Sequence, residues 1–383
     1  MPATSEPPQQ RADGRLRVVF MNWRDTSNPE GGGSEVYVEK VAESFAAAGH
    51  EVTIFCAAHS EAPDREVRRG VRFVRAGSKL GVYLEAARHY RRGELGDPDV
   101  VVDVQNGIPF FSRLVRRGTP TIVLVHHVHR EQWPVVYGPL RSRIGWALES
   151  RVAPRVYRGS AYVTVSESSR DELVALGVRA QDISIVRNGT DTPSSPTGES
   201  RDLSPRVVVL GRIVPHKRVE IAIDTVADLR ADIPGLTLAV IGDGWWSDAL
   251  AQHIATRGAG AYVDLAGFVD DEAKHQALAA SWVMLLPSLK EGWGLAVMEA
   301  AAHGVPCVAF RAAGGVQESI LDGVTGLLVD TPEEMTNALR SLLVDTELRE
   351  RLGAAARDRA ALFTWEMTAQ EFRGVVELVL AAG

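Results

Sequence analysis

The stretch SWVMLLPSLKEGWGLAVME, residues 281–299, contains the pattern that decides the fold. Its apolar run 282–286 predicts a buried strand, which a Pro-Ser pair ends. Gly292 and Gly294 keep the following turn free of side chains, and a helix is expected to begin near Leu295. The first N–H groups of such a helix lack intrahelical partners and carry the positive end of the helix dipole. This segment therefore predicts a place where phosphate oxygens bind.

Two glutamates flank the expected helix start. Glu291 and Glu299 should lie about 12 Å apart at helical rise, which allows one carboxylate at each end of a diphosphate. Carboxylates accept hydrogen bonds from sugar hydroxyls, so the spacing fits a nucleotide sugar. The alternative interpretation is that both are solvated acidic residues near a helix N-terminus, where negative charge is favoured anyway.

Similar strand and helix patterns extend in both directions from this segment. The expected strands are 16–21, 52–56, 71–74, 100–104, 121–125 and 162–165 in the first half, and 207–210, 236–241, 262–265, 282–286 and 305–310 in the second. Continuous apolar strands that alternate with helices indicate parallel sheets covered on both faces. We therefore predict an α/β protein with two doubly wound, Rossmann-like domains, whose ligands bind at the carboxyl edges of the sheets.

The predicted domain organisation has five parts. They are a disordered tail (1–14), a first domain (15–190), a linker rich in Pro, Ser and Gly (191–205), a second domain (206–364) and a terminal helix (365–383). The terminal helix has an apolar face formed by Phe372, Val375, Val376 and Val379.

Composition excludes several classes of protein. The chain has 383 residues, 45% of them hydrophobic, and a formal net charge of −7, which argues against nonspecific nucleic-acid binding. The two cysteines, Cys56 and Cys307, lie in apolar runs, where neither a disulfide nor a metal role is expected. No stretch of about 18 apolar residues occurs, and the N-terminus has no signal-peptide core, so we expect a cytoplasmic protein.

Two further loops contain candidate ligand-binding residues. Gly31, Gly32 and Gly33 precede a helix, as in loops that approach phosphate, although a tight turn capped by Ser34 is equally compatible with the pattern.

The second loop follows the first strand of the second domain. Gly211, Arg212 and Lys217 lie there, where two cations can neutralise a diphosphate, or can simply be solvated.

Three histidines follow the strand 121–125. His126, His127 and His129 invite a metal interpretation, but no distant Cys or His cluster completes a coordination shell, so no metal site is expected. Each imidazole can instead contact a sugar hydroxyl or satisfy backbone groups of the loop.

In this order the segments resemble glycosyltransferase family 4, a retaining family with the GT-B fold of two Rossmann-like domains across a cleft. The resemblance rests on Glu-Gly-aromatic-Gly-Leu with a second Glu after seven residues, on Gly-Arg-x-x-x-x-Lys and on Gly-Gly-x-Glu. It implies that Glu291 contacts the donor sugar and Glu299 the ribose. The family often has Gly after the lysine, where this chain has Arg218.

The resemblance also implies further roles. Catalytic roles fall on Arg212, Lys217, Glu291 and His126, with His127 as the alternative in register. Donor contacts are implied for Gly31, Gly32, Gly33, Gly211, Gly292, Trp293, Gly294, Leu295, Ala296, Glu299 and Glu318. The terminal helix is expected to pack on the first domain.

We therefore expect a cytoplasmic, metal-independent hexosyltransferase without a cofactor, which uses a UDP- or GDP-sugar and an acceptor hydroxyl on a small molecule, glycan or lipid. The alternatives are a sugar-nucleotide epimerase or hydrolase on the same scaffold, or a non-catalytic binding protein. A basic segment, 65–92, either contacts an anionic membrane or is a solvated face.

Overall fold

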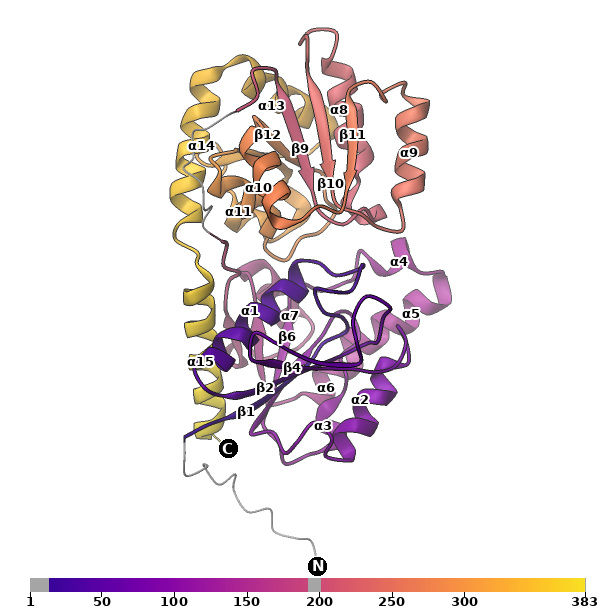
Figure 1. Ribbon diagram of the computed structural model, residues 1–383, viewed down its shortest axis with the longest axis vertical. Coiled ribbons are helices and arrows are strands. Elements are labelled where there is room, and N and C mark those ends of the chain that lie inside the picture. Colours follow the sequence, from indigo (N-terminus) through magenta and orange to yellow (C-terminus); the bar gives the residue numbers. More distant parts are fainter. Residues whose placement is uncertain (1–13, 192–200, 383) are drawn as a thin grey trace, which may run out of the picture. The chain divides into compact units, whose positions relative to one another are not determined.

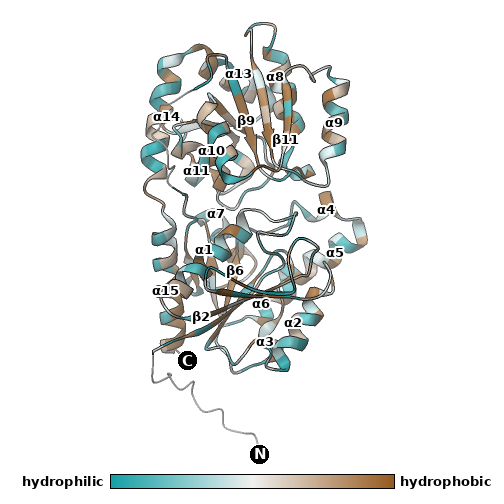
Figure 2. Cartoon of the chain, viewed as in Figure 1, coloured by the Kyte–Doolittle hydropathy of each residue, from teal (hydrophilic) through white to brown (hydrophobic). Residues whose placement is uncertain are grey.

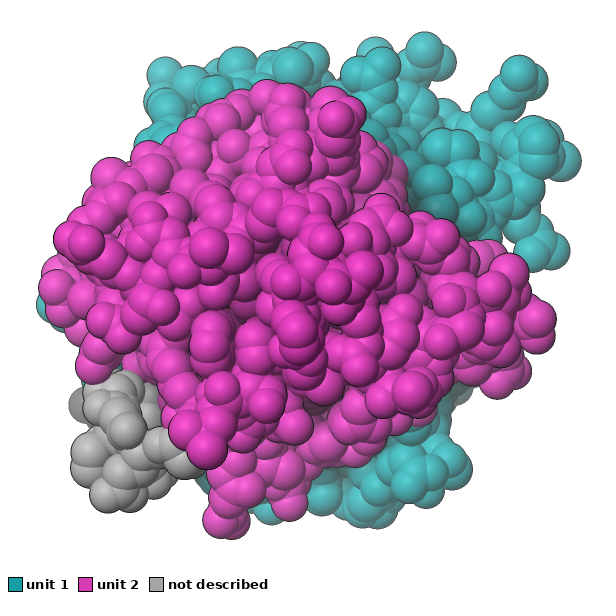
Figure 3. Space-filling model, turned by 90° about the horizontal axis from the view of Figure 1, so that it is seen from above, with its two compact units in different colours: residues 1–187, 365–383 teal, residues 188–364 magenta. Residues whose placement is uncertain are grey.

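The computed structural model describes residues 14–191 and 201–382, which form two compact units. Of the described residues, 14–187 and 365–382 belong to unit 1, and 188–191 and 201–364 belong to unit 2. Figure 3 colours the two units separately. Nearly all of the predicted tail (1–14) and most of the predicted linker (191–205) lie outside the described residues.

Unit 1 is built on an eight-stranded sheet in the order β3-β4-β2-β1-β5-β6-β7-β8. The strands are β1 (Arg17–Met21), β2 (Glu51–Cys56), β3 (Arg65–Arg68), β4 (Val71–Arg75), β5 (Val100–Val104), β6 (Thr121–Val125), β7 (Ala161–Thr164) and β8 (Ile183–Ile185). Only β3 is antiparallel to its neighbour.

The edge strand β3 was not predicted. It pairs with β4 through a two-residue turn, Arg69-Gly70, in which both residues have positive φ angles of 50° and 80°. Such a turn matches the twist of a hairpin, and the charged sequence of β3 suits a sheet edge that meets water. The edge strand β8, only three residues long, was also missed.

Helices cover both faces of this sheet (Figure 1). They are α1 (Gly33–Ala47), α2 (Val82–Arg91), α3 (Ser112–Val115), α4 (Trp133–Val136), α5 (Pro139–Ala147), α6 (Ala153–Val156), α7 (Glu167–Ala175) and α15 (Trp365–Ala382). A π-helical turn, Leu148–Val152, joins α5 to α6, and a 3₁₀ turn covers Ala180–Asp182.

The terminal helix α15 packs within unit 1, against α1. Its buried Phe372 lies beside three aromatic rings of unit 1, with centroid distances of 6.2–6.4 Å to Phe20, Tyr37 and Phe45. Along β1 the side chains alternate, so that Val19 and Met21 join the cluster that includes residues of α2, on the face opposite Phe20.

Unit 2 is a six-stranded parallel sheet in the order β11-β10-β9-β12-β13-β14. The strands are β9 (Arg206–Leu210), β10 (Thr237–Ile241), β11 (Val263–Gly267), β12 (Val283–Leu286), β13 (Cys307–Phe310) and β14 (Gly326–Val329). The helices are α8 (Val219–Leu229), α9 (Ser247–Thr256), α10 (Asp271–Ala280), α11 (Leu295–Ala302), α12 (Val316–Ser319), α13 (Pro332–Val344) and α14 (Thr346–Ala360), with 3₁₀ turns at Pro215–Lys217 and Arg311–Ala313.

The core of unit 2 lies on both faces of its sheet. Val207 and Val209 belong to one buried cluster and Val208 to another, as expected for a strand covered on both sides. Figure 2 shows the hydrophobic residues along the strands. The predicted fold class, two doubly wound parallel α/β domains, is confirmed.

No helix in residues 14–191 or 201–382 has the length and hydrophobicity that spanning a bilayer requires.

Candidate functional site

The strand order of unit 2 places a switch point between β9 and β12. The chain leaves β9 toward β10 on one side of the sheet and later starts β12 on the other, and doubly wound sheets bind ligands just beyond the carboxyl ends of strands at such a point. Lys217 follows β9 and Glu291 follows β12. Topology alone therefore brings two of the predicted site residues to one edge.

A close ion pair joins these two residues. The Nζ atom of Lys217 lies 2.6 Å from Oε1 of Glu291, and their side chains are 21% and 12% exposed. Their loops are also joined by the backbone, because the N–H of Leu289 donates to the carbonyl of His216 at 2.8 Å. Arg212 lies half-buried in the same loop as Lys217, after Gly211, whose φ is 148°.

The departure from the family pattern at Arg218 has a structural explanation. Arg218 has a φ of 50° and caps the N-terminus of α8, a conformation that glycine adopts at low cost. Its guanidinium donates from Nε to the carbonyl of Pro287 at 2.9 Å and lies over the Phe310 ring at 4.6 Å. These contacts connect the end of β12 to the start of α8 and offset the backbone strain.

The turn before α11 packs directly on a second glycine loop. The N–H of Glu291 donates to the carbonyl of Ala313 at 2.8 Å, and that of Gly315 donates to the carbonyl of Glu291 at 3.2 Å. A Cβ atom on Gly315 would lie 1.8 Å from the carbonyl oxygen of Gly292. No residue but glycine fits there, so this contact fixes the backbone that leads into the helix.

The helix α11 begins at Leu295, as predicted, with Gly294 at its N-cap in the left-handed region (φ 88°). Leu295 and Ala296 supply N–H groups of its first turn. Trp293 is 2% exposed, and its ring lies 5.1 Å from that of Phe363. The side chain of Trp293 therefore anchors the turn, and only its backbone is placed for a ligand contact.

The second glutamate is paired with a lysine that the sequence did not single out. The Nζ atom of Lys274, on α10, lies 2.8 Å from Oε1 of Glu299 and 2.9 Å from Asp271. Burial lowers the pKa of Lys274, but the carboxylates of Glu299 and Asp271 together more than offset this, so that the pKa is raised. Glu318 is half-buried on α12, and its backbone carbonyl accepts a hydrogen bond from Arg359.

In unit 1 the glycine loop is capped differently from the expectation. Gly32, and not Ser34, is the N-cap of α1, and its N–H donates to Oε2 of the buried Glu35 at 2.8 Å. This is the glutamate half of a capping box. A Cβ atom on Gly31 would lie 2.8 Å from the carbonyl oxygen of Asp25, so the loop folds tightly on itself, and Gly33 is already the first residue of the helix.

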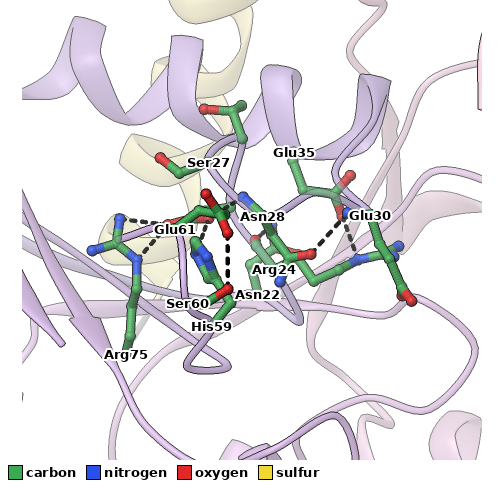
Figure 4. A network of polar contacts seen from close by, with 12 residues as sticks. Asn22, Arg24, Ser27, Asn28, Glu30, Glu35, His59, Ser60, Glu61 and Arg75 are labelled. Atoms are coloured by element: carbon green, nitrogen blue, oxygen red, sulfur yellow. Dashed lines mark hydrogen bonds and ion pairs between the residues drawn. The ribbon is translucent and has the colours of Figure 1, made fainter. Parts of the chain in front are cut away.

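A buried polar network holds this loop in place (Figure 4). Asp25 accepts a hydrogen bond from Nε of Arg75 at 2.6 Å and lies 3.0 Å from Nε2 of His59. Arg24 reaches Glu30 at 3.2 Å and Glu35 at 3.8 Å. Asp25 and His59 were not predicted, because residues so far apart in the chain give no local pattern.

Most cations of the basic segment 65–92 form ion pairs with carboxylates. Six of its nine cations form ion pairs within unit 1: Arg68 with Glu39, Arg69 with Glu43, Arg75 with Asp25 and Glu66, Lys79 with Glu30, Arg88 with Glu85, and Arg92 with Glu94. The segment is therefore not the unneutralised positive surface that its composition predicts.

The two candidate histidines lie in different surroundings. His126 is 6% exposed, its ring meets Tyr37 edge-on at 5.1 Å, and among the described residues its Nε2 has no hydrogen-bond partner. Burial, with a smaller effect from His129, lowers its pKa to about 3. His127 is half-buried, with its ring 4.3 Å from that of His129. Within the described residues no group of three potential ligands is placed to hold a metal ion.

The neutral state of His126 predicts a pH dependence of stability. Its folded-state pKa lies below the value of about 6.5 expected in the unfolded chain, so the unfolded state takes up a proton first as the pH falls. Between pH 7 and pH 5 this should remove about 2 kcal/mol from the free energy of unfolding. Chemical denaturation of wild type and His126→Gln at both pH values measures it. An equal loss in both proteins would contradict the assignment.

Two α/β units with doubly wound parallel sheets, one with cations and a glycine-flanked helix at its switch point, define the GT-B class of fold. A family model for "Glycosyltransferase Family 4" matches residues 31–193, and one for "Glycosyl transferases group 1" matches residues 195–359. The D-inositol 3-phosphate glycosyltransferase of Stackebrandtia nassauensis is 30% identical over 424 residues, covering 96% of this chain and 92% of that protein.

Two further proteins resemble the whole chain. The glycogen synthase of Mycobacterium tuberculosis is 27% identical over 393 residues, covering 92% of both chains. The solved structure of sucrose-phosphate synthase from Thermosynechococcus elongatus matches with a TM-score of 0.81 at 22% identity, covering 96% of this chain and all of that one. This chain belongs to glycosyltransferase family 4.

Proposed function

We propose that this protein transfers a hexose from a nucleoside diphosphate sugar to an acceptor hydroxyl with retention of the anomeric configuration. The observation that carries the proposal is the Lys217–Glu291 pair at the switch point of unit 2, next to the glycine-flanked N-terminus of α11. A cation, a carboxylate and free helix N–H groups in one place match the charges and hydroxyls of an activated sugar.

In the proposed reaction the acceptor oxygen bonds to the anomeric carbon on the face from which the diphosphate leaves. The bond from that carbon to the phosphate oxygen breaks, and the acceptor proton passes to the departing phosphate. Arg212, Lys217 and the first turn of α11 stabilise the negative charge that develops, without a metal or cofactor. Glu291 would hold the hexose hydroxyls and Glu299 the ribose.

Unit 1 is proposed to bind the acceptor. A neutral His126, or His127 beside it, can bond a sugar hydroxyl without repelling positive charge at the anomeric carbon. The glycine loop before α1, braced by Asp25 and Arg75, offers a rigid backbone for close approach of a ligand. The expected cytoplasmic location stays a prediction.

The proposal is tested by measuring the thermal unfolding of the full chain with a panel of UDP- and GDP-sugars, because a ligand that binds only the native state raises its stability. The donor found this way is then incubated with candidate acceptors, and released nucleotide is measured. Acceptor-dependent release supports transfer. Conversion or cleavage of the donor without an acceptor would indicate an epimerase or hydrolase, and binding without any turnover a binding protein.

Replacing Glu299 by alanine is expected to weaken nucleotide binding about tenfold while the turnover number changes little, since a charged hydrogen bond to the ribose is lost. Lys274→Met should have a similar effect, because it leaves the Glu299 carboxylate, 17% exposed, without its cation. Titration calorimetry with the identified nucleotide measures both changes.

The matched control is Asp228→Ala. Asp228 lies on α8 and forms an exposed ion pair, 2.9 Å long, with Arg257, the residue that follows α9. Nucleotide affinity in this variant should equal that of wild type. If Glu299→Ala binds as tightly as the control, the ribose assignment is wrong.

A further inference from the structure

A basic and apolar surface of unit 1 has no part in the proposed transfer reaction. It consists of exposed residues of α4, α5, the π-helical turn, α6 and the loop that follows, and we call it the α4–α6 surface: Val135, Val136, Leu140, Arg141, Arg143, Ile144, Arg151, Val152, Arg155 and Arg158. Figure 2 shows hydrophobic and hydrophilic residues next to each other along α4 and α5. Leu140 is 72% exposed and Ile144 53%.

The spacing on α5 places both kinds of residue on one side of the helix. Leu140 and Ile144 are four residues apart and share one side of the helix with Arg143. Arg141 lies at the edge of that side, and all four residues are exposed. Large aliphatic side chains flanked by arginines are the composition of helices that lie in a bilayer interface.

A buried anchor holds α5 in this orientation. Nε1 of Trp133 donates to Oε2 of the fully buried Glu149 at 2.6 Å, and the N–H of His129 donates to Oε1 of the same carboxylate at 3.0 Å. The Trp133 ring packs so closely on α5 that a Cβ atom at Gly145 would lie 2.3 Å from it. The apolar side chains therefore face outward because the opposite face is occupied.

The charges of this surface differ from those of the basic segment 65–92. Among the described residues, none of the ion pairs involves Arg141, Arg143, Arg151, Arg155 or Arg158. The fully buried Glu149 lies nearby, but its carboxylate accepts hydrogen bonds from Trp133 and His129. In a chain of net charge −7, this concentrates uncompensated positive charge at one place. Guanidinium groups stay charged at all physiological pH values and bind phosphate oxygens in a fork.

We propose that the α4–α6 surface binds an anionic lipid bilayer. Leu140 and Ile144 enter the boundary between headgroups and acyl chains, and the arginines bind the lipid phosphates while their alkyl stems cover apolar surface. Five exposed aliphatic residues, three of them valines, are too few to hold the chain on a neutral bilayer, so binding depends on anionic lipid and weakens with salt. This moves the membrane contact from the predicted segment 65–92 to residues 135–158.

The proposal is tested by sedimentation of the full chain with vesicles, without donor or acceptor, so that the outcome is independent of the transfer reaction. One set of vesicles is phosphatidylcholine alone, and the other is phosphatidylcholine with about one third phosphatidylglycerol. The variants are Arg141→Gln with Arg143→Gln, and Leu140→Ser with Ile144→Ser. The controls on α2 are Arg88→Gln, whose cation is paired with Glu85, and Leu84→Ser, which is 74% exposed.

Wild type should bind only the anionic vesicles, and salt should weaken the binding. The affinity of the Arg141/Arg143 double variant for anionic vesicles should fall about 30-fold, since each arginine contributes about fivefold. The affinity of the Leu140/Ile144 double variant should fall at least about tenfold. Both controls should bind as wild type does. Circular dichroism confirms that each variant is folded.

Three results would overturn the proposal. The first is absence of binding to anionic vesicles. This includes the case in which the chain binds a soluble inositol phosphate through Arg141 and Arg143 but does not bind the vesicles. The second is unchanged binding by the Leu140/Ile144 variant, which would mean attraction to any polyanion. The third is an equal loss in the α2 controls.

Discussion

Replacing Lys217 by alanine is expected to lower the turnover number of sugar transfer by about 10²- to 10³-fold, with a smaller change in donor affinity. The lysine lies at the switch point of unit 2, paired with Glu291 at 2.6 Å. We propose that its charge is needed most when the diphosphate departs, so its loss raises the barrier more than it weakens binding. Steady-state kinetics with the identified donor, together with calorimetric titration of that donor, separate the two effects.

The control for this variant is Arg340→Ala, which breaks an exposed ion pair of unit 2 with Asp232 at 2.5 Å. Surface pairs of this kind contribute about 0–1 kcal/mol to stability, so turnover should be unaffected. A Lys217→Ala protein with wild-type turnover would remove Lys217 from the site.

Replacing Gly315 by alanine is expected to destabilise unit 2 by about 1–3 kcal/mol and to weaken donor binding at least about tenfold. The φ of Gly315 is −58°, which alanine adopts freely, so backbone strain is not the cause. The added methyl group would lie 1.8 Å from the carbonyl oxygen of Gly292 and would push apart the two loops that set the start of α11. Thermal unfolding and donor titration measure both effects.

Gly260→Ala is the matched control, since no atom lies within 4 Å of the Cβ that it adds. This variant should unfold and bind donor as wild type does. If Gly315→Ala matched the control in both measurements, the packing of the two glycine loops would not determine the site.

The fold was predictable because its strands are continuous apolar runs separated by helices. The start of α11 was placed at Leu295 because glycine residues flank it and the strand before it ends in Pro-Ser. The strand β3 was missed because Arg-Glu-Val-Arg has no apolar pattern, and its pairing depends on the turn at Arg69-Gly70. β14 was missed because a four-residue strand that begins with glycine is hard to recognise.

The candidate site was predictable only in part. Spacing placed Glu291 beside a helix start, and the resemblance added Lys217, but their contact depends on which strands are neighbours in the sheet. Three features could not be found in this way: the burial of the Trp293 side chain, the pairing of Glu299 with Lys274, and the support of the glycine loop by Asp25 and Arg75. Each depends on residues that only the folded chain brings together.

The proposed diphosphate site of unit 2 is tested most directly by a crystal structure of the full chain with the nucleoside diphosphate of its donor. We expect a diphosphate bound against the N-terminus of α11, with oxygens within hydrogen-bond distance of Arg212 and Lys217 and the ribose hydroxyls on Glu299. A diphosphate that binds at another place in the chain, or one that leaves the Lys217–Glu291 pair untouched, would contradict it.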